Sequence, residues 1–126
     1  MSKYVLDASA VLALLNDEPG ADQVEALLAE SCISAVNAAE VLTKLIDAGM
    51  PDAEALESFE LLGLEIIDFD LRLAARAAAL RRATKKKGLS LGDRCCLALG
   101  LAMGQEVVTA EREWAKLNLC PTRLIR

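Results

Sequence analysis

The sequence contains no histidine. Histidine is the commonest general base and the commonest transition-metal ligand in proteins, so its absence excludes Ser-His-Asp sites, Cys-His sites and histidine-ligated metal centres. Any hydrolytic activity of this chain must therefore depend on carboxylates, on lysines or on a hard metal ion.

Long apolar runs are also missing. The runs that are present, such as CCLALGLAM over residues 95–103, fall well short of the roughly 20 residues that a bilayer-spanning helix needs. Near the N-terminus, Asp7 interrupts the apolar stretch and no small-residue cleavage pattern follows, so we expect no signal peptide. These absences predict a cytoplasmic protein without a membrane span.

The four cysteines show neither C-x-x-C nor C-x-x-H spacing, which argues against a zinc site. Two of them are adjacent and point to different sides of any helix that contains them. We expect all four to be small, reduced core residues: Cys32, Cys95, Cys96 and Cys120.

Composition indicates one folded domain over residues 1–126. Of the 126 residues 54% are hydrophobic and 26% are charged, and only three prolines interrupt the chain. These values are typical of a globular protein, and the length suits a single core.

Short apolar segments alternate with longer helical patterns along the chain. We expect strands at 3–7, 32–35, 64–69 and 106–110, with an edge strand at 122–126. We expect helices at 8–17, 21–30, 37–49, 52–63, 70–87, 90–104 and 112–118. Strands separated by helices pair in parallel through right-handed crossovers. The predicted fold class is therefore α/β, a three-layer α/β/α sandwich with a central parallel sheet of four to five strands.

Charge is distributed unevenly along this acidic chain. Residues 1–70 carry a net charge of −13 and residues 71–126 a net charge of +8. Much of the positive charge lies in LRLAARAAALRRATKKKG, residues 71–88. This segment is either a solvated helix face whose cations favour the C-terminal end of the helix dipole, or a surface that contacts a phosphate backbone.

Four acidic residues follow or lie near the predicted strand ends. Asp7 ends the first strand, Glu40 opens the helix after the second, Asp93 opens an apolar helix, and Glu111 follows the strand at 106–110. In open parallel sheets, ligands bind outside the carboxyl ends of the strands, where three of these four positions fall. We expect the four carboxylates to converge.

Helix capping is the alternative explanation for these acids. Ser90 to Asp93 matches S-x-x-[DE], Asn37 to Glu40 is a close relative of it, and Asp7 can itself be an N-cap. Capping explains poorly why Asp7 and Asp93 lie in apolar surroundings, because buried carboxylates are costly and repel one another. A divalent cation removes that conflict, and an all-oxygen ligand set favours Mg²⁺ or Mn²⁺.

The order and spacing of these blocks resemble the four acidic motifs of PIN-domain proteins, and most closely those of the VapC toxins of toxin–antitoxin pairs. The blocks are YVLDASAVLALLNDEPG, NAAEV, GLSLGDRCCLALG and VVTAEREWAKL. The resemblance implies a divalent-metal-dependent endoribonuclease that leaves a 5′-phosphate and a 3′-hydroxyl. It also implies a cognate antitoxin as inhibitor and, commonly, a homodimer.

On matching positions, the resemblance makes Asp7, Glu40 and Asp93 the acidic metal site. The fourth position is usually aspartate and here is Glu111. Its extra methylene leads us to expect that Glu111 either reaches the metal through water or does not ligate it. All four acids are predicted to be catalytic.

Further residues of the same motifs have predicted roles. Ser9 and Thr109 match hydroxyl positions that help to order the site in this family. Arg94 and Arg112 lie beside the acids, where they either contact substrate phosphate or pair with a neighbouring carboxylate. The lone tryptophan, Trp114, is expected to pack in the core or an interface, with stacking on a base as the alternative.

Two other functions compete with the nuclease hypothesis. A phospho-acceptor signalling domain needs paired acids after its first strand and a lysine after its last, and this chain has neither. The second alternative is a protein-binding module that has the PIN fold but no catalytic activity. The glutamate at position 111, where aspartate is usual, favours this alternative.

Overall fold

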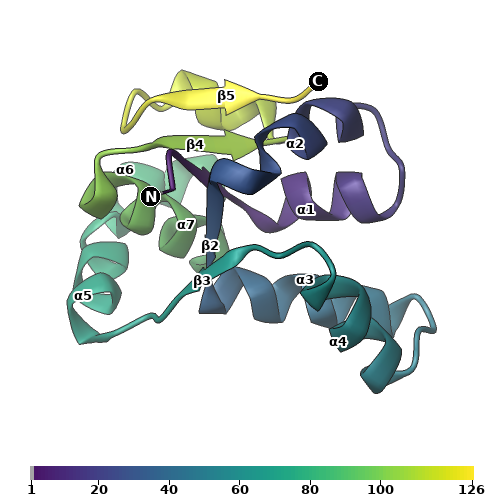
Figure 1. The fold of residues 1–126 in the computed structure, drawn as a ribbon. Helices are drawn as coiled ribbons and strands as arrows, with labels where there is room; N and C mark the ends of the chain where they lie inside the picture. The colour runs from purple at the N-terminus through teal and green to yellow at the C-terminus, as the bar shows by residue number, and fades with distance from the viewer. Residues whose placement is uncertain (1) are drawn as a thin grey trace.

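The computed structural model describes residues 2–126, and it contains one sheet of five parallel strands (Figure 1). The strand order is β3-β2-β1-β4-β5, and all four pairings are parallel. The strands are β1 (Tyr4–Leu6), β2 (Ser31–Ser34), β3 (Glu65–Ile67), β4 (Glu106–Thr109) and β5 (Thr122–Leu124). The predicted parallel sheet is confirmed, and its expected edge strand pairs with β4.

Helices connect these strands at every crossover. The α-helices are α1 (Ala8–Leu15), α2 (Ala21–Leu27), α3 (Ala35–Asp47), α4 (Asp52–Glu60), α5 (Leu71–Ala79), α6 (Arg81–Thr84) and α7 (Leu91–Met103). Three 3₁₀ helices complete the chain: η1 (Leu28–Glu30), η2 (Lys85–Lys87) and η3 (Arg112–Lys116).

Both faces of the sheet are buried, which makes the predicted three layers. Neighbouring residues of a strand point to opposite faces. Leu6 and Val108 pack with α1–α4 on one face, while Val5 and Val107 pack with α5, α7 and η3 on the other. In Figure 1 the first group of helices lies at the right and α5–α7 at the left.

The strand order reverses beside β1. The chain builds outward from β1 to β2 and β3, and then returns to the other side of β1 for β4 and β5. Such a switch point opens a crevice at the carboxyl ends of the strands, because the connections leave to opposite sides. Asp7 follows β1, and Glu111 follows β4 by two residues, so both acids lie at this crevice.

The basic segment at 70–87 is not one helix, contrary to our expectation. It forms α5, α6 and η2, with a break at Leu80. The carbonyl oxygen of Ala77, in the last turn of α5, accepts a 3.0 Å hydrogen bond from Nη1 of Arg94 in α7. The Thr84 hydroxyl donates to the Leu80 carbonyl oxygen at 2.8 Å. Arg94 thus satisfies the Ala77 carbonyl at the break, while the Leu80 carbonyl accepts both the Thr84 hydroxyl and, at 3.2 Å, the Thr84 backbone N–H.

Other expectations about the core hold. All four cysteines are free, three of them are buried, and Trp114 is buried at 3% exposure in the core cluster beneath α5 and α7. Among residues 2–126, no helix has the length and apolarity that crossing a membrane requires.

Candidate functional site

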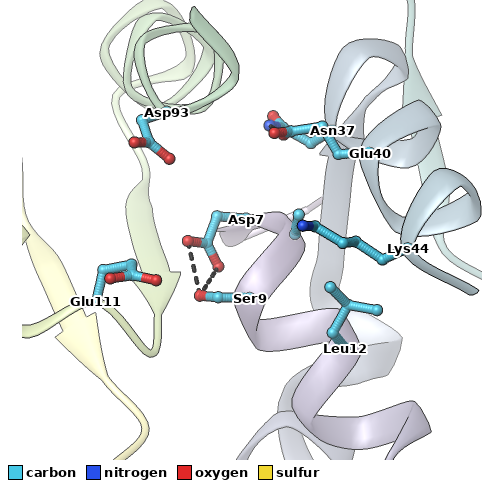
Figure 2. A pocket seen from close by; sticks show the side chains of 9 residues that line it. Asp7, Ser9, Leu12, Asn37, Glu40, Lys44, Asp93 and Glu111 are labelled. Atoms are coloured by element: carbon cyan, nitrogen blue, oxygen red, sulfur yellow. Dashed lines mark hydrogen bonds between the residues drawn. The ribbon is translucent and has the colours of Figure 1, made fainter. Parts of the chain in front are cut away.

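A pocket of about 210 Å³ lies at the switch point and gathers all four predicted acids (Figure 2). Its lining comes from both sides of the sheet's carboxyl edge. The polar residues that line it are Asp7, Ser9, Asn37, Glu40, Lys44, Asp93 and Glu111. The expected convergence of the four acids on one pocket is therefore observed.

Asp7 is the buried acid of the pocket, with only 3% of its surface exposed. It is the N-cap of α1, and its Oδ1 accepts a 2.8 Å hydrogen bond from the backbone N–H of Ala10. The pKa of this carboxyl is raised from 3.8 to about 6, mainly by burial and to a lesser extent by the charge of Asp93, while hydrogen bonds from Thr109, Ala10 and Ser9 oppose the rise. No salt bridge among residues 2–126 includes Asp7.

Two hydroxyls hold the Asp7 carboxylate in place. The Ser9 hydroxyl lies 2.8 and 2.9 Å from its two oxygens, and the Thr109 hydroxyl donates to Oδ2 at 2.6 Å. Each hydroxyl also accepts a backbone N–H, Ser9 from Ala110 and Thr109 from Glu111, both at 2.9 Å. Because a hydroxyl has one proton to donate, these N–H groups leave it directed at Asp7. This geometry agrees with the site-ordering role predicted for both residues.

Glu111 differs from Asp7 because no capping hydrogen bond holds its carboxylate. It is exposed and occupies the N-cap position of η3, yet its side chain caps nothing. Capping therefore does not explain this acid. Its backbone N–H donates to Thr109, while its carboxylate lines the pocket and forms no salt bridge within residues 2–126.

On the opposite wall, an amide holds Glu40. Asn37 is 1% exposed, and its side-chain nitrogen donates to Glu40 Oε1 at 2.6 Å and to the Gly92 carbonyl oxygen at 2.9 Å. Its side-chain oxygen accepts the Ser34 hydroxyl proton at 2.6 Å. Asn37 therefore joins the end of β2, the helix α3 and the first turn of α7.

The structure corrects the capping interpretation of Asn37. The helix α3 begins at Ala35, and its N-cap is Ser34, whose hydroxyl accepts the backbone N–H of Asn37 at 3.0 Å. Asn37 and Glu40 do not form the capping box that their spacing suggested. The sequence pattern did not mark Asn37 as a site residue, because β2 runs directly into α3 with no linker.

Gly92 brings α7 against the Glu40 carboxylate. A Cβ atom built at Gly92 would collide with both carboxylate oxygens of Glu40, although the backbone there is ordinary helix. The missing side chain thus allows two acid-bearing helices to approach each other at this wall.

Asp93 serves as a cap and as a pocket residue. Its N–H donates to the Ser90 hydroxyl at 3.1 Å and its Oδ2 accepts the Ser90 N–H at 2.9 Å, so the predicted capping box is present. Asp93 also lines the pocket. It is half-buried, which corrects the expectation of a buried acid, because α7 turns its polar first turn toward the pocket.

Lys44 also faces these acids, although it belongs to none of the acidic sequence motifs. It lies one helical turn after Glu40 on α3, and in Figure 2 its ammonium group points into the pocket toward Asp7. The i,i+4 spacing from Glu40 was the available signal, because residues at this spacing share a helix face.

The two arginines lie in different environments. Arg94 donates to the Ala77 carbonyl, and its Nε is buried without a hydrogen-bond partner among the described residues. Arg112 is exposed, and no salt bridge of residues 2–126 includes it.

The site fits a hard divalent ion that keeps part of its water shell. Across residues 2–126, no three acidic or thiol side chains are close enough together to hold one ion between them. Mg²⁺ is usually bound through one or two carboxylates with several waters, and the pocket has room for such waters. The uncompensated burial of Asp7 is the feature that a cation would relieve.

Comparison with known proteins extends over nearly the whole chain. The sequence profile of the PIN domain matches residues 4–118. No protein in the curated comparison set matches this chain by sequence.

Several solved structures share its fold. DNA-bound VapBC from Salmonella typhimurium matches with a TM-score of 0.78 over 100% of both chains, at 19% identity. VapBC2 from Rickettsia felis, bound to promoter DNA, gives 0.76 over 96% of this chain and 97% of the other, at 19% identity. A toxin–antitoxin complex from Klebsiella pneumoniae gives 0.75 over 98% of each, at 22% identity. At such identities the likeness is one of fold.

Proposed function

This chain belongs to the PIN-domain family, and from that premise we propose that it is a divalent-metal-dependent endoribonuclease acting as the toxin of a toxin–antitoxin pair. The observation that carries the proposal is the pocket itself. Four carboxylates from separate parts of the chain line one pocket at the switch point of the sheet, and one of them, Asp7, is buried with a raised pKa. Acids at such energetic cost are typical of functional sites.

The similar structures support the toxin assignment. They are VapBC assemblies and a toxin–antitoxin complex. We propose by analogy a cytoplasmic protein that forms a homodimer and is inhibited by a cognate antitoxin. The antitoxin would lay an amphipathic segment in a groove and present a basic group to the acidic pocket.

The residues suit metal-assisted hydrolysis of RNA. Asp7 and Asp93 would hold Mg²⁺ or Mn²⁺, with Ser9 and Thr109 fixing the orientation of Asp7. When bound, the ion lowers the pKa of water and stabilises negative charge on phosphoryl oxygens. We assign the orientation of water and of the scissile phosphate to side chains of the protein.

Glu40 is placed to orient the attacking water. Its carboxylate is held by Asn37 at 2.6 Å, so the oxygen that remains free keeps a defined direction into the pocket. Glu111, exposed and unrestrained, is suited to a contact through an outer water rather than to direct ligation.

Lys44 supplies a cation to the same pocket. We propose that its ammonium group contacts a non-bridging oxygen of the scissile phosphate, since it points toward Asp7 and belongs to the pocket lining. Arg94 is already bonded to Ala77, whereas Arg112 is exposed and free to approach phosphate.

Cleavage of a labelled structured RNA tests the function. We expect cutting with Mg²⁺ or Mn²⁺, none with EDTA, and products that carry a 5′-phosphate. Asp93→Asn should abolish cutting while retaining the fold, because asparagine can still accept the Ser90 N–H. Equal cutting by this variant would indicate a contaminating nuclease and contradict the site assignment.

A protein-binding module without catalysis is the second candidate. The glutamate at position 111 and the lack of three clustered acidic or thiol side chains within residues 2–126 favour it. Failure to cut a broad set of RNAs, combined with retained antitoxin binding by Asp7→Asn, would support this alternative.

A further inference from the structure

Seven cations gather on the segment formed by α5, α6 and η2, which we call the basic surface. All seven are exposed. None of them forms a salt bridge within residues 2–126. They are Arg72, Arg76, Arg81, Arg82, Lys85, Lys86 and Lys87.

Cations elsewhere on the protein are mostly paired. Lys3 bonds Glu30 at 3.0 Å, Lys116 bonds Glu113 at 3.3 Å, and Arg123 and Arg126 each bond a glutamate. An acidic chain therefore leaves its densest group of positive charges without internal partners. Such a concentration of one charge is unfavourable for folding through self-repulsion, and it attracts polyanions.

The helix dipole accounts for only part of this surface. Cations stabilise the C-terminal end of a helix, and six of the seven lie in last turns, whereas Arg72 lies in the first turn of α5, at the positive end of the dipole. Between the cations the surface carries alanines. Ala78 and Ala79, with Arg81 and Arg82, line a hollow of about 620 Å³. The small side chains allow a bulky strand to come close to the flanking guanidinium groups.

The basic surface is attached to the wall of the acidic pocket. Arg94 follows Asp93 directly and donates to the Ala77 carbonyl at the end of α5. The side chain of Ala77 packs with Cys95 and Ala98 of α7. The end of α5 is thus fixed against the turn of α7 that carries Asp93, and Figure 1 shows α5, α6 and α7 together on one side.

We propose that the basic surface binds the phosphate backbone of the RNA on one side of the cleavage site. This inference rests on the proposed ribonuclease function. The pocket alone repels a phosphodiester because it is lined by four carboxylates. Phosphates bound along α5, α6 and η2 offset that repulsion and deliver the neighbouring phosphate past Asp93 into the pocket.

The test measures RNA affinity without cleavage. A fluorescently labelled single-stranded RNA is titrated with the protein in EDTA at several salt concentrations. The test variant combines Arg81→Ala with Arg82→Ala. The matched control combines Lys3→Ala with Lys116→Ala, which removes the same charge from paired sites.

We expect the arginine variant to bind roughly tenfold more weakly at 0.1 M salt and to lower the salt slope by about 1.4, from two lost single-strand phosphate contacts. The control should stay within about twofold, because it removes the same net charge without removing a contact. Circular dichroism and thermal melting confirm that both variants fold. Unchanged affinity and slope in the arginine variant would overturn the proposal.

Further measurements distinguish failure of the proposed nuclease function from failure of the proposal for the basic surface. If the native protein cuts no RNA but shows this charge-dependent binding, the basic surface stands and the nuclease function fails. If the arginine variant cuts RNA in Mg²⁺ with an unchanged KM, the surface proposal fails and the nuclease stands. Tighter binding of the native protein to polyglutamate than to RNA would assign the surface to an acidic protein and overturn the RNA proposal.

Discussion

The two walls of the pocket hold their carboxylates in different ways. On the strand wall, Asp7 is buried and accepts hydrogen bonds from Ala10, Ser9 and Thr109. On the helix wall, Glu40 is half-exposed and is held by Asn37. The strand wall stabilises the buried charge of Asp7 through hydrogen bonds, whereas the helix wall fixes the orientation of the Glu40 carboxylate.

This difference separates what each wall contributes. Removing the Asp7 charge changes the pH dependence of stability, because burial disfavours that charge and no salt bridge of residues 2–126 includes it. Removing the support of Glu40 changes the orientation of its carboxylate. The free energy of unfolding falls only where a buried polar group loses its hydrogen-bond partner. The following variants test this contrast, beginning with the largest expected effect.

The first comparison is native protein against Asp7→Asn in EDTA. The folded-state pKa of Asp7 is raised from 3.8 to about 6. The folded protein therefore holds a proton that the unfolded chain releases, and this stabilisation is complete below pH 3.8 and lost as pH rises through 6. A shift of this size corresponds to roughly 3 kcal/mol. The variant carries no such charge.

Urea denaturation from pH 4 to 8 measures this effect. We expect the variant to gain stability relative to the native protein as pH rises, by up to roughly 3 kcal/mol. Mn²⁺ added at pH 7 should stabilise the native protein and leave the variant unchanged. A native-to-variant difference that is constant with pH would contradict the account of the strand wall.

Asn37→Ala tests the amide of the helix wall. In a buried site, the change removes the acceptor of the Ser34 hydroxyl proton and the side-chain donor to the Gly92 carbonyl, while the backbone bond from residue 37 to Ser34 remains. We expect a loss of about 1–3 kcal/mol in the free energy of unfolding, with no dependence on pH between 4 and 8. Cleavage should also fall, because Glu40 loses its orientation. A stability loss below 0.5 kcal/mol, roughly half the net value of one hydrogen bond, would show that Asn37 does not join the two helices.

Gly92→Ala separates activity from stability. The new Cβ displaces the Glu40 carboxylate, which is the flexible end of a side chain, while alanine favours the helix by roughly 0.5–1 kcal/mol. We expect an unchanged or slightly higher melting temperature and a fall in cleavage of about 10–100-fold, as for other supporting residues of metal sites. Leu91→Ala, at an exposed neighbour, is the control and should cut normally.

Thr109→Val has the smallest expected effect. The Thr109 hydroxyl lowers the pKa of Asp7, so its removal raises that pKa further. Because a metal ligand must be ionised, Mn²⁺ binding should then require a higher pH. Titration of Mn²⁺ at several pH values measures the shift, and a shift to lower pH would be inconsistent with the hydrogen bond.

Features that depend on local patterns could be predicted from the sequence. The parallel sheet of four to five strands followed from alternation, and spacing also offered the observed N-cap at Asp7 and the capping box of Ser90 and Asp93, as alternatives to a metal site. The convergence of four acids followed from a topological rule about strand ends. Such features need no knowledge of which side chains touch.

Features that depend on long-range contacts were not predicted. The break at Leu80 involves a bond between Arg94 and Ala77, 17 residues apart in the chain. The role of Asn37 depends on Gly92, 55 residues away. A pattern read along one segment cannot report a partner on another helix.

Calorimetric titration of Mn²⁺ into the native protein and Asp7→Asn at pH 7.5 tests the central claim most directly, namely that the acidic pocket holds a divalent ion. We predict saturable binding to the native protein, absent in the variant although it is folded. Equal binding by both proteins, or no binding by either, would contradict a metal site built around Asp7.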